Sequence, residues 1–120
     1  MSTYVDGFVI PIPKTKVNAY KKMAKMGAKT WMKHGALAYY ECVADDIKAP
    51  YSINFPTMTK AKKNETVIFA FIVFKSKAHR NKVNAKVHKE FGEMPGAENF
   101  AMPFDISKMA FGGFKTLAQG

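Results

Sequence analysis

The stretch Val67–Phe74, VIFAFIVF, is the longest uninterrupted apolar run in the chain, and it decides the fold class. Eight apolar residues are too few to span a lipid bilayer, and short runs rich in β-branched and aromatic residues are typical of strands. Because every position is apolar, neither face of this strand is suited to water. We therefore expect a central strand that helices cover on one face and something else covers on the other.

The segments on either side of this strand alternate between strand and helix patterns. The expected elements, in chain order, are a strand over 4–12, a helix over 15–34, strands over 36–44 and 66–74, a helix from Ser76 to about Gly92, and a strand over 109–118. A further short β-arm is expected over 58–60. The order βαββαβ is that of the ferredoxin-like fold, an α+β architecture with an antiparallel four-stranded sheet and two helices on one face.

Length and composition indicate one ordinary domain. With 120 residues and no internal repeat, the chain is expected to form a single domain over 1–120. Cys42 is the only cysteine, so no internal disulfide is possible. The chain contains no segment with the pattern of a signal peptide or a membrane span. We expect a cytoplasmic protein that does not bind membranes.

The charge of the chain is strongly positive, at +10. Of the 19 Lys and Arg residues, only Arg80 is an arginine. Base readout and phosphate recognition favour the planar, bidentate guanidinium group of Arg, whereas Lys serves solubility equally well. The charge is therefore expected to solvate the protein, and a nucleic-acid-binding module that uses the Lys-rich helix faces stays as the alternative.

The end of the central stretch also fits the RNA-recognition-motif consensus, in which alternate aromatic residues stack on bases. An RNA-binding version needs Lys or Arg followed by Gly at its first two positions, where this chain has Val67 and Ile68. The strand over 4–12 carries Asp6, and a carboxylate on the open face would repel a phosphate backbone. The sequence therefore predicts no specific nucleic-acid partner.

Alternation along the strands predicts which side chains point away from the helices. Val5 and Val9 suit the helix-facing side, which leaves Asp6 for the opposite face, and Glu41 is placed there because a carboxylate is costly under a helix. Tyr39 joins Glu41 by alternation, and Cys42 is then expected to be a core residue on the helix-facing side. Such a face is too apolar for water, so we expect a second copy of the protein to cover it.

Four segments carry a resemblance to a known family: YVDGFVIPIPK, HGALAYYECVADD, ETVIFAFIVFKSKAHRNKVNAKV and MPFDISKMAFGGFK. Together they closely resemble the bacterial YbaA-like family, a domain of unknown function family numbered 1428. The resemblance implies a dimeric α/β barrel, a superfamily that includes cofactor-free monooxygenases and haem-degrading enzymes. It implies no established reaction for this chain.

Several polar residues are candidates for lining a pocket. Asp6 and Glu41 could form a paired acid and base with Tyr39 as a hydrogen-bond donor, or each could simply pair with a cation or an amide. Arg80, at the helical angle of Val83, could anchor an anionic ligand or neutralise a strand carboxylate.

The loop sequence MPFD adds two more candidates. Phe104 could plug a barrel mouth, and Asp105 could cap a turn or reach a ligand. His34, His79 and His88 are too scattered for a metal triad, so we expect neither a metal nor a cofactor.

The leading hypothesis is a homodimeric α/β barrel that binds a small, partly apolar molecule, with cofactor-independent, monooxygenase-like chemistry as an extension suggested by the resemblance. A structural or interaction protein with no open pocket is the remaining alternative. Whether the protein is an enzyme, and which ligand it binds, the sequence does not determine.

Overall fold

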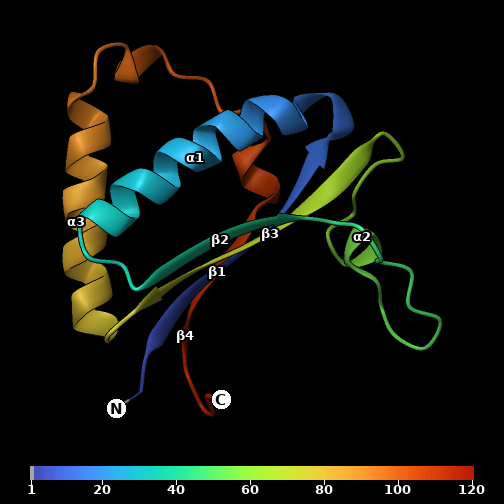
Figure 1. Cartoon of the computed structure of the whole chain (residues 1–120). Coiled ribbons are helices and arrows are strands. Elements are labelled where there is room, and N and C mark those ends of the chain that lie inside the picture. Colours follow the sequence, from blue (N-terminus) through green and yellow to red (C-terminus); the bar gives the residue numbers. More distant parts are fainter. Residues whose placement is uncertain (1) are drawn as a thin grey trace.

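The computed structural model describes residues 2–120 and contains one four-stranded antiparallel sheet with the strand order β2-β3-β1-β4 (Figure 1). The strands are β1 (Tyr4–Pro13), β2 (Ala38–Val43), β3 (Glu65–Phe74) and β4 (Ala110–Lys115). The helices are α1 (Val17–Lys33), the one-turn α2 (Phe55–Met58) and α3 (Lys77–Glu93). The α+β class and the four-stranded antiparallel sheet predicted from the sequence are confirmed.

Local sequence explains where the two long helices begin and end. The Ser76 side chain accepts a hydrogen bond from the backbone N–H of His79 and so caps the start of α3, as the sequence predicts. Gly35, just past the end of α1, has a φ of 112°, a conformation that only glycine adopts without strain.

One face of the sheet forms the core with both long helices. Tyr20 and Ala24 of α1 pack against the β1 and β3 residues Ile10, Ile12, Ile68 and Ala70. Val83 and Val87 of α3 pack against Ile72 and Phe74, farther along the same side of β3. Phe8 contacts both clusters, and Figure 1 shows α1 and α3 on the same side of the sheet.

The predicted assignment of strand faces is wrong. Asp6, Tyr39 and Glu41 lie on the helix-facing side: Asp6 is directly opposite Ile72, and its side chain is only 1% exposed. The helices supply hydrogen-bond partners for both carboxylates, which removes the expected cost of placing a carboxylate under a helix. By the same alternation Cys42 is exposed on the opposite side and is not the core residue that the sequence predicts.

The opposite side of the sheet, called the open face below, is uncharged along most of its length. Its residues follow from the register of the strand pairs: Val5, Gly7 and Val9 of β1; Ala38, Tyr40 and Cys42 of β2; Phe69, Phe71 and Val73 of β3; and Ala110, Gly112 and Phe114 of β4. Tyr40 and Phe114 are 56% and 60% exposed, and the Tyr40 ring stacks on Phe71 with 5.0 Å between centroids. This face therefore presents several large apolar side chains to water.

Residues 44–64, called the arm below, connect β2 to β3. The predicted β-arm over 58–60 is wrong, because this segment contains α2, which the Asn54 side chain caps by accepting a hydrogen bond from Thr57 N–H. Pro56, in the first turn of α2, suits a helix start and cannot donate to a strand ladder. Figure 1 shows the arm on the side of the sheet away from α1 and α3. Over the described residues 2–120, no helix combines the length and the apolar character that crossing a membrane requires.

Candidate functional site

Asp6 lies in a buried polar network between β1 and α3. Arg80 Nη1 donates to Asp6 Oδ1 at 3.1 Å, and Asn84 Nδ2 donates to Asp6 Oδ2 at 3.2 Å. The network continues to α1, where Trp31 Nε1 donates to Asn84 Oδ1 at 2.9 Å. Arg80 also lies over the Tyr4 ring, 5.0 Å from its centroid. Of the two roles weighed for Arg80, the geometry shows neutralisation of a strand carboxylate.

Burial dominates the ionisation of Asp6. Removal from water raises the pKa of the Asp6 carboxyl above its ordinary value, and the hydrogen bond from Asn84 and the charge of Arg80 lower the pKa only in part. The folded protein therefore binds a proton at Asp6 more readily than the unfolded chain does.

This pKa shift gives a testable pH dependence. A raised folded-state pKa contributes stability that is complete below the unfolded-state pKa, about 3.9 for Asp, and is lost as pH rises through the folded-state value. We therefore expect the free energy of unfolding of the wild type, relative to Asp6→Asn, to increase as the pH falls from 7 to 4. Urea unfolding of both proteins at several pH values measures this difference. A difference that shrinks in acid would show that the ion pair holds the pKa below its ordinary value.

Glu41 forms a second network, between β2 and α1. The hydroxyl groups of Tyr20 and Tyr39 each donate to a different oxygen of the Glu41 carboxylate at 2.6 Å. Burial, followed by these hydrogen bonds, raises the pKa of both tyrosines above the ordinary value. The arrangement keeps both phenols protonated and gives the carboxylate two donors in place of water.

Asp6 and Glu41 do not form the acid and base pair that the sequence suggested. They lie on β1 and β2, which are separated by β3, so about two strand spacings, roughly 10 Å, lie between them. Each carboxylate instead has its own donors from a helix. Direct proton transfer between the two is therefore excluded by distance.

Phe104 and Asp105 precede β4. The Phe104 ring packs against Tyr20, with 5.8 Å between centroids, at the edge of the α1 cluster. Asp105 Oδ1 accepts hydrogen bonds from the backbone N–H and the hydroxyl of Ser107, which lower the pKa of Asp105 and begin the 3₁₀ turn Ile106–Lys108. Asp105 therefore caps a turn, one of the two roles weighed for it.

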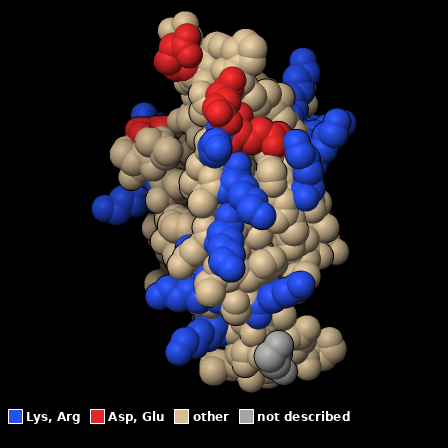
Figure 2. All heavy atoms as spheres, turned by 90° about the vertical axis from the view of Figure 1, so that its left-hand side faces the viewer, with Lys and Arg blue, Asp and Glu red and all other residues tan. Residues whose placement is uncertain are grey.

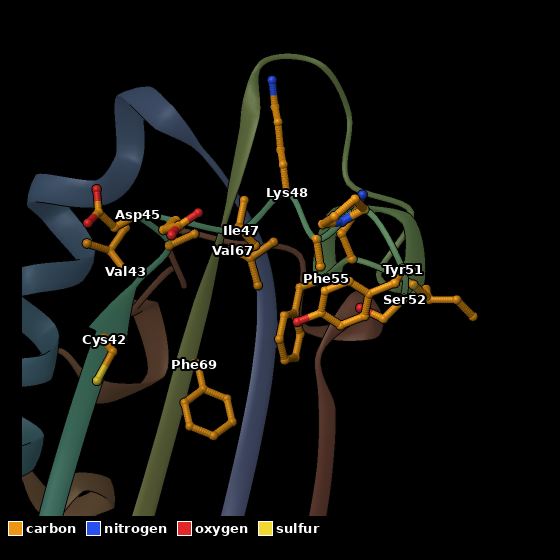
Figure 3. Close-up of a pocket in the computed structure, with 16 residues that line it drawn as sticks. Cys42, Val43, Asp45, Ile47, Lys48, Tyr51, Ser52, Phe55, Val67 and Phe69 are labelled. Carbon is orange, nitrogen blue, oxygen red and sulfur yellow. The ribbon is translucent and has the colours of Figure 1, made fainter.

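A pocket of about 600 Å³ lies elsewhere, between the open face and the arm (Figure 3). All of its walls come from one continuous segment, 42–55, together with Val67 and Phe69 of β3. Phe55 and Phe69 contact one another in its wall, with 6.3 Å between ring centroids. Cys42, Asp45 and Lys48 also line the pocket, and Figure 3 shows the amino end of Lys48 directed away from Phe55 and Phe69.

None of the six residues selected from the sequence lines this pocket within the described chain. Contact of Asp6, Tyr39, Glu41, Arg80, Phe104 or Asp105 with a ligand stays a prediction. Most of the pocket residues are missed by sequence reasoning because the arm reads as a polar passage with two prolines. The signal that could have found them is the spacing of Tyr51, Ile53 and Phe55, three large apolar residues at alternate positions.

The charged groups of the described residues bear on whether the chain has a metal site or a basic surface. Among residues 2–120, no group of three His, Cys, Asp or Glu side chains could hold a metal ion. Figure 2 shows Lys and Arg side chains spread over one side of the molecule, with uncharged surface between many of them and several acidic groups gathered near one end. This spread is typical of a solvated surface.

The antiparallel sheet, its helices and the pocket on its open face define a ferredoxin-like α+β protein with an unpaired apolar sheet surface. The fold is similar to a crystal structure described as a dimeric ferredoxin-like protein from an uncultured marine organism, with a TM-score of 0.56 and 12% identity, over 98% of this chain and 96% of that one.

Sequence comparison identifies the family. The model of the DUF1428 family, described as a protein of unknown function, matches residues 3–106, and the chain belongs to this family. The uncharacterized protein YbaA of Escherichia coli K12 is 39% identical over 119 residues, which cover 95% of this chain and 96% of the relative. The Shigella flexneri protein of the same name matches to the same extent. The resemblance seen in the sequence is confirmed.

Proposed function

We propose that the protein is a homodimer in which the open faces of two copies pack together and enclose pockets for a small, partly apolar molecule. The observation that carries the proposal is the open face itself. It exposes several aromatic rings, and from Phe69 to Val73 of β3 neither this strand nor the paired positions on the other strands place a charged side chain on it. A monomer would leave this surface in water, whereas soluble monomers rarely expose large contiguous apolar patches. The similar crystal structure is described as dimeric, which supports a dimer here.

The pocket supports binding of a small molecule with an apolar part. Phe55 and Phe69 offer ring faces, and Asp45 and Lys48 offer polar contacts near the rim. A volume of about 600 Å³ falls within the range of known ligand sites, roughly 300–1,000 Å³. The proposal covers binding; a cofactor-independent reaction on the bound molecule stays a prediction from the family resemblance.

Sedimentation and thermal shift together test the proposal. We expect a dimer at micromolar concentration and at least one member of a small-molecule library that raises the melting temperature, because a ligand that binds only the folded state stabilises it. The variant Phe55→Ala should reduce that shift, whereas Phe100→Ala, at an exposed ring outside the pocket, should preserve it. Wild-type protein that stays monomeric would contradict the dimer. A ligand that raises the melting temperature of both variants equally would exclude the pocket as its binding site.

The reactivity of Cys42 gives an independent measurement. Cys42 is exposed on the open face of a single copy, so the proposed dimer should cover it. We expect its rate of reaction with a thiol reagent to fall at least about tenfold as protein concentration rises through the dimer dissociation constant. The same rate in a dilute and a concentrated sample would show that the open face stays free.

A further inference from the structure

The arm presents apolar side chains that the rest of its own chain does not cover. Tyr51 is 90% exposed and Ile53 is 77% exposed, while Phe55 and Met58 are each about half exposed. Exposure of single apolar residues is ordinary, but four large ones within eight positions form a patch. The Phe55 ring, which faces Phe69, connects this patch to the open face.

The arm covers only one end of the open face. Val67, which has the same orientation on β3 as Phe69 and Phe71, is 2% exposed, and its β1 partner Pro11 is also buried. Phe69, one pleat farther along the strand, is already 46% exposed. The arm and the uncovered part of the open face therefore form two walls of one concave apolar surface, with the pocket at their junction.

The area of this surface fits a second copy of the chain. If each large side chain has roughly 200 Å² of surface, the exposed parts of Tyr40, Phe69 and Phe114 amount to about 300 Å². By the same reckoning the four arm residues add about 500 Å². Each partner in a standard-size complex contributes roughly 800 Å², and these three rings together with the four arm residues reach about that area.

We infer that the arm of each copy lies against the open face of the other copy, so that each pocket is completed by a residue of the partner. This inference rests on the proposed dimer, and it adds that the arm is the segment that contacts the partner. In one copy the pocket has walls only from segment 42–55 and two residues of β3, and it is partly open to solvent. In a two-fold arrangement the surface that the arm meets on the other copy is the same uncharged open face, which accepts apolar arm side chains without burying an unpaired charge.

The first test removes the arm contacts and leaves the strands intact. The double variant Tyr51→Ser, Ile53→Ser should raise the dimer dissociation constant at least about 100-fold, as measured by sedimentation equilibrium. The matched control Phe100→Ser, Met26→Ser removes an exposed aromatic and an exposed aliphatic side chain outside the arm and the open face, and should leave the constant within about threefold. Equal dissociation constants for the arm variant and the wild type would overturn the arm inference while the dimer stands. Wild-type protein that is monomeric throughout would overturn the dimer and the inference together.

The second test locates the arm directly. One copy carries Cys42→Ser and Ser52→Cys and has a nitroxide spin label attached at position 52. It is mixed with a wild-type copy that is isotope-labelled for NMR and carries no spin label. We expect amide signals of the open-face strands in the isotope-labelled copy to broaden, because a nitroxide affects nuclei of the neighbouring subunit. A mixed dimer without such broadening would place the arm away from the partner and contradict the inference.

Discussion

Phe71→Lys should convert the dimer into a folded monomer. Phe71 lies in the middle of the open face, opposite Gly7 on β1 and Tyr40 on β2, and its side chain points away from both core clusters. In a two-fold interface the substitution buries two unpaired ammonium groups, each costing about 3–5 kcal/mol. We expect the dissociation constant to rise by about a thousandfold or more.

Circular dichroism and sedimentation separate loss of the dimer from loss of the fold. Met26→Lys places the same charged side chain at an exposed position of α1 and should leave the dimer intact. Far-UV spectra of both variants should match the wild type, because neither position belongs to the buried core. A Phe71→Lys protein that is still dimeric at micromolar concentration would show that the open face is not the interface.

Arg80→Met should destabilise the fold by about 3–5 kcal/mol at neutral pH. The substitution keeps an apolar side chain over Tyr4 and removes the cation from an Asp6 carboxylate that has almost no contact with water. Breaking a buried ion pair by removing one partner leaves an uncompensated charge. Part of the loss should return as the pH falls, since Asp6 can then take up a proton.

Two further variants isolate the contribution of the Arg80–Asp6 ion pair to stability. Lys82→Met removes a charge from an exposed position on the same helix and should cost less than about 0.5 kcal/mol. The double variant Asp6→Asn, Arg80→Met should recover much of the stability, because it removes both charges and keeps the shape of the strand side chain. If Arg80→Met costs no more than Lys82→Met in urea unfolding, the ion pair does not stabilise the protein.

The sequence is sufficient for the four strands of the sheet and the two long helices because each depends on short-range features. The apolar run Val67–Phe74, the Ser76 cap and the glycine after α1 all act within a few residues of one another. Strand faces depend on distant partners, and alternation alone leaves two equivalent choices. The predicted choice rests on Val5 and Val9 for β1 and on Glu41 avoiding the helices for β2, although Arg80 and Tyr20 provide the donors for both carboxylates there.

One residue in the sequence carries the information that corrects the assignment of side chains to the two faces of the sheet. Arg80 is at the inward angle of α3 with Val83, so a lone guanidinium group had to be buried next to the sheet. A buried guanidinium needs a carboxylate, and Asp6 is the only carboxylate on the first strand. The pocket had no comparable signal, because it depends on how the arm folds back toward Phe69, and no periodic pattern specifies that path.

Phe8 is one of the side chains that connect the two halves of the core and so affects how they respond to unfolding. The α1 cluster and the α3 cluster share no buried residue, and Phe8 packs against both of them. Proteins open in cooperative units whose boundaries follow the density of packing. Trp31 is a second connection, because it belongs to α1, packs against the α3 cluster and donates a hydrogen bond to Asn84. Hydrogen exchange should therefore report α1 and α3 as one unit, and a smaller side chain at position 8 should lower the protection of both helices together, because Trp31 still joins them.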